Sequence, residues 1–193
     1  MDEYRRIMVA VSGASGAVYA QGLLEVLPRA YETIYLTASD NARDIMRDEI
    51  DAEDVFDLVP ASAAQRFRVL EPNDMSAPVA SGSHEYDGLV VIPCSMGVVG
   101  RIASGVSDDL VSRAADVCLK ERRKLILVVR ETPLSLVHLR NMTALAEAGA
   151  VILPAAPAFY GKPESISDMV DFVVDRVLRV LGVEERLVKG WGE

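Results

Sequence analysis

The feature that most constrains the fold is a regular alternation of short apolar runs with longer amphipathic segments. The short runs are rich in β-branched residues, apolar on both faces and flanked by Gly, Pro or Ser, which is typical of buried parallel strands. They occupy 7–11, 34–37, 89–92, 125–129 and 151–153. The amphipathic segments have apolar positions at helical spacing and charged outer faces. They occupy 18–27, 41–48, 109–122, 136–148 and 166–181.

This alternation predicts one α/β domain over residues 1–193, with a Rossmann-like, doubly wound, mostly parallel sheet and helices on both faces. The chain is long enough for one such core, but not comfortably for two. Ser39 precedes the second helix as a typical N-cap residue, and Gly149 follows a later helix as a typical helix-terminating glycine. Segment 52–82 is less regular because prolines interrupt it, and its apolar run 67–70 predicts one further strand.

Composition and charge exclude several classes of protein. A net charge of −9 argues against a nucleic-acid partner, since phosphate backbones require an excess of Lys and Arg. No stretch is apolar enough to span a membrane, and no secretory signal is expected. Cys94 and Cys118 lie in apolar segments without a CxxC pair, which predicts reduced thiols and a cytoplasmic location. His84 and His138 lack neighbouring ligand residues, so no metal site is expected.

Small and hydroxyl-bearing residues follow several of the expected strands. Open parallel sheets bind their ligands at the carboxyl ends of the strands, so these residues mark the expected binding edge. Loop 12–16 is rich in glycine and opens a helix, and its backbone N–H groups and the Ser15 hydroxyl suit a phosphate. The loop is neither GxGxxG nor a P-loop, so a tight turn without a ligand is an equal alternative.

Charged residues at the same edge indicate an anion. Arg130 and Glu131 directly follow an apolar strand, which favours an anion site with a proton-transfer group over a structural ion pair. Tyr160 follows a proline-rich loop. Its ring either packs over that loop, or its phenol donates a hydrogen bond to an anionic ligand. Arg113 and Lys120 are two helical turns apart and share a helix face, which is directed to solvent, to a phosphate or to a neighbouring subunit.

Several short blocks, in one order and spacing, carry a family resemblance. They are Gly13-Ala-Ser-Gly16, Pro93-Cys-Ser-Met96, Arg113-Ala-Ala-Asp116, Leu119-Lys-Glu-Arg-Arg123, Arg130-Glu-Thr-Pro133, His138-Leu139 with Met142, and Pro157-Ala-Phe-Tyr160. Together they resemble the UbiX-type flavin prenyltransferases over nearly the whole chain.

The resemblance implies a flavoprotein fold and a homododecamer whose active sites lie where subunits meet. It also implies transfer of a dimethylallyl group from dimethylallyl phosphate to N5 and C6 of reduced FMN, without a metal. The product, prenylated FMN, would pass to a UbiD-type decarboxylase.

The resemblance assigns roles to individual residues. The flavin would contact a set of loop residues: Gly13, Ala14, Ser15, Ser39, Ser95, Met96, Gly97, Val98 and Arg130. The donor phosphate would meet Tyr160 and Arg176. Charge would be added by Arg113 and Lys120, which adjacent subunits would contribute. Three positions match residues linked to catalysis, namely Ser15, Glu49 and Glu131. Of these, Glu131 is the expected proton acceptor or donor.

Two positions depart from the family pattern. Gly97-Val98 stands where Lys-Thr is common, which removes a side-chain contribution to flavin binding. His84 stands where an aromatic residue is frequent, whereas Trp191 matches a family aromatic that would cover the site.

Two alternatives to prenyl transfer stay open. One is a flavin-dependent cysteine decarboxylase of the same fold, ranked lower because its expected catalytic His and Asn-rich loop are not found. The other is a flavin-binding or flavin-delivery protein that does not transfer a prenyl group.

Overall fold

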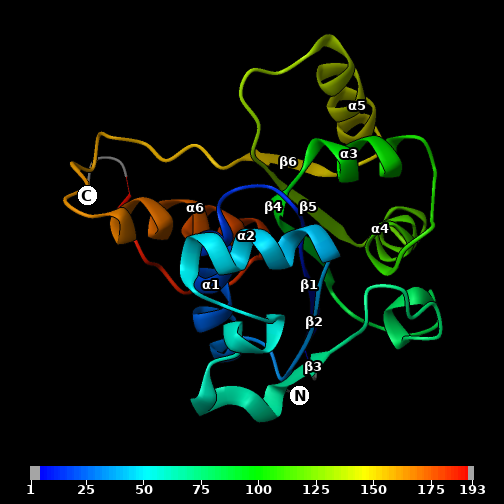
Figure 1. Ribbon diagram of the computed structural model, residues 1–193, viewed down its shortest axis with the longest axis horizontal. Coiled ribbons are helices and arrows are strands. Elements are labelled where there is room, and N and C mark those ends of the chain that lie inside the picture. The colour runs from blue at the N-terminus through cyan, green and yellow to red at the C-terminus, as the bar shows by residue number, and fades with distance from the viewer. Residues whose placement is uncertain (1–4, 191–193) are drawn as a thin grey trace.

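The chain is built around one six-stranded parallel sheet with strand order β3-β2-β1-β4-β5-β6 (Figure 1). The computed structural model describes residues 5–190, so Trp191 lies outside the described part of the chain. The strands are β1 (Arg6–Val11), β2 (Thr33–Ala38), β3 (Phe67–Val69), β4 (Gly88–Cys94), β5 (Lys124–Val129) and β6 (Val151–Pro154). The order reverses between β1 and β4, which makes their carboxyl ends the topological switch point of the sheet.

Helices cover both faces of this sheet. The α-helices are α1 (Ala17–Val26), α2 (Asp40–Ile50), α3 (Met96–Ala103), α4 (Leu110–Lys120), α5 (Leu136–Glu147) and α6 (Ile166–Leu181). Short 3₁₀ helices are η1 (Leu27–Arg29), η2 (Val55–Leu58), η3 (Ala61–Arg66) and η4 (Pro78–Ala80). Residues of α1, α2 and α6 pack in one core cluster, and residues of α3, α4 and α5 pack in the other. The doubly wound fold expected from the sequence is therefore confirmed.

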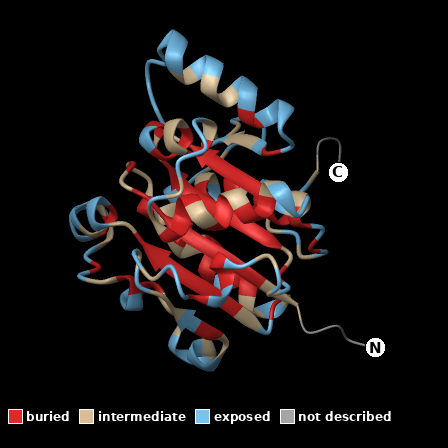
Figure 2. Ribbon diagram, turned by 90° about the vertical axis from the view of Figure 1, so that its right-hand side faces the viewer, coloured by how far each residue is buried: buried red, intermediate tan, exposed pale blue. Residues whose placement is uncertain are grey.

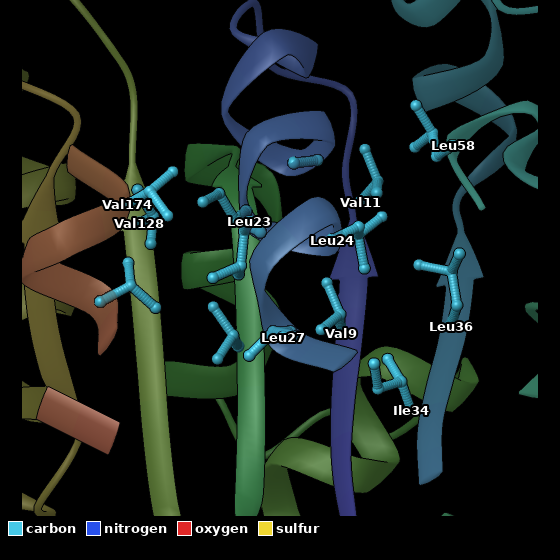
Figure 3. Packing of buried hydrophobic residues seen from close by; sticks show 14 of the residues in the cluster. Val9, Val11, Leu23, Leu24, Leu27, Ile34, Leu36, Leu58, Val128 and Val174 are labelled. Atoms are coloured by element: carbon cyan, nitrogen blue, oxygen red, sulfur yellow. The ribbon is translucent and has the colours of Figure 1, made fainter. Parts of the chain in front are cut away.

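The two core clusters follow from the alternation of side chains along each strand. In β1, Ile7, Val9 and Val11 face the first cluster, whereas Met8 and Ala10 face the second. Figure 3 shows the first cluster, where Leu23 and Leu24 of α1 lie over the sheet. Buried residues are concentrated in the sheet and the helix faces against it (Figure 2). This double burial explains why the central strands are apolar on both faces. The prediction of a buried strand at 151–153 is wrong, because β6 lies at the edge of the sheet and is only partly buried.

The elements agree closely with those expected. The last helix has the predicted bounds, 166–181, and the run at 67–70 contains β3. Gly149 has the positive φ (104°) of a glycine that ends a helix. The sequence pattern does not predict helix α3, because its eight residues include two glycines. Its formation rests on burial of Val98, Val99 and Ile102 rather than on helix propensity.

Candidate functional site

Ser12 joins the two central strands at the switch point. Its side chain is buried, its Oγ donates to the Pro93 carbonyl at 2.8 Å, and it accepts from the Ser95 N–H at 2.9 Å. The loop after β1 and the loop after β4 are thereby held in a fixed relative position. Sequence reasoning gave Ser12 no role, because its importance depends on which strands become neighbours.

Replacing Ser12 with Ala is expected to lower the free energy of unfolding by about 1–3 kcal/mol, since the part-buried Ser95 N–H loses its acceptor and the Pro93 carbonyl keeps only the longer bond from the Ser12 N–H. Urea denaturation measures this change. Ser104→Ala is the matched control, because the exposed Ser104 hydroxyl donates to the Gly100 carbonyl and water can replace it. Equal losses in the two variants would contradict the structural role of Ser12.

The glycine-rich loop after β1 packs closely against α2. A Cβ on Gly13 would lie 2.6 Å from the Asn41 Cβ, so only glycine fits there. Gly16 has φ 113°, a left-handed conformation that also favours glycine. The Glu49 carboxylate accepts the N–H groups of Gly16 and Ala17, each at 2.8 Å. These first amides of α1 therefore already bind an anion, and a ligand phosphate requires other donors.

Other donors surround a cavity of about 270 Å³ at the ends of β1, β2 and β4, which we call the strand-end pocket. It is lined by Gly13, Ser39, Asp40, Asn41, Pro72, Asn73, Ser95, Gly97, Val98, Arg101 and Asp109. Ser39 is the N-cap residue of α2, yet its side chain makes no capping hydrogen bond. The N-terminus of α3 also faces the pocket. A hydroxyl and a helix N-terminus at one cavity suit the phosphate of a mononucleotide.

Arg130 links the carboxyl end of β5 to the first loop. Its backbone N–H donates to the Cys94 carbonyl at 3.2 Å, and its Nε donates to the Ser15 carbonyl at 3.1 Å. Tyr19 lies beside this contact, where burial raises the pKa of its phenol and the charge of Arg130 partly opposes that shift. Ser15 and Arg130 are thus brought together, next to a phenol that remains protonated and was not predicted as a site residue.

Tyr160 and Arg176 form a second polar cluster. Tyr160 lies in the segment that leaves the carboxyl end of β6, and Arg176 lies on α6. The Arg176 Nη2 donates to the Tyr160 hydroxyl at 3.4 Å, and the guanidinium lies 5.1 Å from the centroid of the Phe172 ring. Phe172 also contacts the Tyr160 ring edge-to-face. A cavity of about 400 Å³ adjoins this cluster and is lined partly by Tyr160, Phe172, Lys162 and Lys189.

Glu131 lies at the same edge of the sheet, two residues after the end of β5. Its carboxylate accepts the N–H of Thr132 at 3.0 Å and is exposed. It borders an apolar hollow of about 340 Å³ whose lining includes Leu134, Leu139 and Met142. The Glu131 carboxylate is thus accessible to solvent and also lies beside apolar side chains.

Arg113 and Lys120 do not join the strand-end residues within one chain. Arg113 donates to the Ala80 carbonyl at 3.0 Å and pairs with Asp116 at 2.8 Å, whereas Lys120 pairs with Glu121. Lys120 precedes β5 and Arg130 follows it, so the six-residue strand separates them by about 20 Å. Within one chain, these two cations are therefore engaged by other partners, and Lys120 lies far from Arg130.

The described residues hold neither a metal site nor a membrane helix. Between residues 5 and 190, no three His, Cys, Asp or Glu side chains are grouped so as to hold a metal ion. Within the same range, none of the helices is both long and apolar enough to cross a membrane. Cys94 is a free, fully buried thiol, and burial raises its pKa, so it stays protonated and is not a nucleophile.

The fold is that of a doubly wound α/β protein, and the strand-end pocket at its switch point suits a mononucleotide. A family model described as Flavoprotein matches residues 1–178. The flavin prenyltransferase UbiX of Thermoplasma acidophilum is 46% identical over 96% of this chain and 99% of its own. That of Pseudomonas aeruginosa is 43% identical over 97% of this chain and 94% of its own. The chain belongs to the UbiX family of flavin prenyltransferases, as the sequence blocks indicated.

Solved structures agree with this assignment. AnUbiX (PadA1), in complex with FMN and dimethylallyl pyrophosphate, is 45% identical with a TM-score of 0.88, over 98% of this chain and 100% of that one. A dodecameric FMN-dependent UbiX-like decarboxylase of Escherichia coli is 40% identical with a TM-score of 0.89, over 97% of this chain and 100% of that one. The peptidyl-cysteine decarboxylase EpiD, 14% identical with a TM-score of 0.58 over 89% of this chain and 99% of that one, shares only the fold.

Proposed function

We propose that this chain transfers a dimethylallyl group from dimethylallyl phosphate to N5 and C6 of reduced FMN. The observation that carries the proposal is the presence of two separate donor clusters beyond the carboxyl ends of the strands. One is the strand-end pocket with Arg130, and the other is the Tyr160–Arg176 pair. A prenyl transferase of this kind requires two such sites, because the flavin and the donor each carry a phosphate. FMN is the prenyl acceptor, and its reduced ring supplies the nucleophilic atoms.

The flavin would be held by residues that the fold gathers at the switch point. Ser39, Ser95 and the first turn of α3 suit its phosphate, and Ser15 beside Arg130 suits a polar edge of its ring system. The remaining members of the proposed flavin site are loop and helix-start residues: Gly13, Ala14, Met96, Gly97 and Val98. Gly13 allows the close approach of loop and helix on which this pocket depends.

The donor phosphate would bind at Tyr160 and Arg176. The bond from carbon to oxygen breaks with the electron pair passing to the phosphate, so negative charge develops there. A guanidinium and a phenol that are already oriented by Phe172 would stabilise that charge as it forms. These side chains require no metal ion to perform this role.

Three residues are proposed to act in catalysis. Glu131 would move a proton during ring closure and phosphate departure, since it is a carboxylate at the binding edge. Ser15 would lie next to the ring, because Arg130 holds its carbonyl. Glu49 binds two amides of α1 and so also fixes the position of the Ser15 loop.

We propose further that the active form is a homo-oligomer, with a dodecamer as the expected size. Large apolar side chains are exposed on α5, before α6 and at its first residue, including Leu136 (60%), Val137 (62%), Phe159 (68%) and Ile166 (73%). Exposed apolar groups of this size favour burial against a second copy. Such packing would also allow a neighbouring chain to bring Arg113 and Lys120 to the donor phosphate.

A UbiD-type decarboxylase would consume the product. We place the reaction in the cytoplasm, where the two free cysteines would remain reduced.

Incubating the protein with FMN, a reductant and dimethylallyl phosphate tests the proposed reaction. Mass spectrometry of the extracted flavin should show the addition of one C5 unit. Unmodified flavin that remains bound would instead support the flavin-delivery alternative. Peptidyl-cysteine or pantothenoyl-cysteine substrates should not be decarboxylated.

A further inference from the structure

The strand-end pocket contains a cation to which the family resemblance gave no role. Among the described residues that line this pocket, Arg101 alone is cationic, whereas Asp40 and Asp109 are acidic. The two carboxylates repel an anion, whereas the N-terminus of α3 and the serine hydroxyls attract it. The attraction of these neutral groups must therefore offset the repulsion by two negative charges. An anionic ligand in this pocket therefore requires the charge of Arg101.

Arg101 is placed to reach the space that Gly97 leaves open. The two residues are four positions apart on α3 and thus lie on one face of the helix, and helical side chains lean toward the N-terminus. A Cβ added to Gly97 would meet only the Ser95 Oγ, at 3.8 Å. Arg101 therefore extends toward a part of the pocket in which position 97 supplies no side chain.

The contacts of Arg101 leave part of its hydrogen-bonding capacity unused. Its Nη2 pairs with Asp109 Oδ2 at 2.9 Å, and its Nε is 3.9 Å from Asp108 Oδ1. That Nε is buried and makes no hydrogen bond within residues 5–190. A buried guanidinium N–H without an acceptor is costly unless a ligand satisfies it.

We propose that Arg101 binds the phosphate of FMN and sets the preference of this chain for FMN over riboflavin. The inference rests on the proposed function. It explains how a chain with Gly97-Val98 in place of the common Lys-Thr pair keeps a positive charge in its phosphate pocket. The cation comes from the next turn of the same helix instead of from position 97. Asp109, the N-cap residue of α4, orients it.

The test compares the affinities of the flavin-free full chain for FMN and for riboflavin by fluorescence quenching. Arg101→Ala should weaken FMN binding by about 10- to 100-fold, the usual effect of losing a charged hydrogen bond. Riboflavin binding should change by less than about threefold, because riboflavin has no phosphate. Arg101→Gln, which can still bond to Asp109, should show the same loss of preference. The ratio of the two affinities within one preparation does not depend on how much of the variant is folded.

A second variant separates charge from structure. Arg101→Ala combined with Gly97→Lys should restore the preference for FMN, because a lysine one turn nearer the helix start enters the same pocket. Arg29→Ala, which removes an ion pair with Glu185 elsewhere on the surface, should leave both affinities unchanged.

Equal weakening of FMN and riboflavin in Arg101→Ala would overturn the inference, as would an unchanged preference. A wild-type chain that binds neither flavin would instead contradict the proposed function itself.

Discussion

Glu131→Gln is expected to slow prenyl transfer by about 10²- to 10⁴-fold, the usual contribution of a positioned proton-transfer group. Glutamine keeps the size of the side chain and an acceptor for the Thr132 N–H, but it cannot exchange a proton at neutral pH. The affinity for FMN should change little, because Glu131 does not line the strand-end pocket. Anaerobic single-turnover experiments with reduced FMN and dimethylallyl phosphate measure the rate, and fluorescence quenching measures the affinity.

The matched control for this variant is Glu147→Gln, which changes an exposed glutamate at the end of α5. It should retain the wild-type rate. A Glu131→Gln enzyme within about threefold of the wild-type rate would exclude Glu131 as a proton acceptor or donor. The role would then fall to another group at the sheet edge.

Arg176→Ala is expected to lower kcat/KM for dimethylallyl phosphate by about 10²- to 10³-fold, as loss of one donor to a developing anion does in other enzymes. The variant removes the group that bonds to the Tyr160 hydroxyl and stacks on Phe172, so both phosphate binding and charge stabilisation suffer. Retention of FMN should be nearly intact, since the flavin phosphate is assigned to the strand-end pocket. Steady-state kinetics and the flavin content of the purified protein measure the two effects.

Arg29→Ala, which loses an ion pair with Glu185 elsewhere on the surface, controls for the loss of a positive charge. If Arg176→Ala lost FMN and donor use together, a separate donor pocket would be contradicted. A loss of less than about threefold in kcat/KM would show that Arg176 does not contact the donor phosphate.

The sequence predicted the fold well because both faces of this sheet are covered. Strand β4 is buried throughout and β1 is buried after Arg6, so they appear as continuous apolar runs that solvent-facing strands do not show. Helix α6 was predicted with its observed bounds because its apolar positions keep helical spacing over 166–181, and in the structure Ser165 caps its start and the left-handed Gly182 ends it. Helix α3 also has a capping serine, Ser95, but it is only eight residues long and contains Gly97 and Gly100, so its packing against the second core cluster is what stabilises it.

The gathering of predicted site residues at one edge of the sheet was also predictable, since parallel strands place their carboxyl ends together. Ser15 and Arg130 do meet, and Tyr160 meets Arg176. Contacts that depend on tertiary structure were not predictable. No spacing rule places Glu49 at the start of α1, 32 residues away from Ala17. Helical periodicity showed that Arg113 and Lys120 share a face, but it does not tell which edge of the sheet that face adjoins.

The most direct test of this account is a crystal structure of the chain with FMN and dimethylallyl phosphate bound. We expect the flavin phosphate in the strand-end pocket, the flavin ring beside Ser15 and Arg130, and the donor phosphate in contact with Tyr160 and Arg176. A flavin bound away from the carboxyl ends of β1 and β4 would contradict it. So would a donor phosphate that occupies the same pocket as the phosphate of FMN.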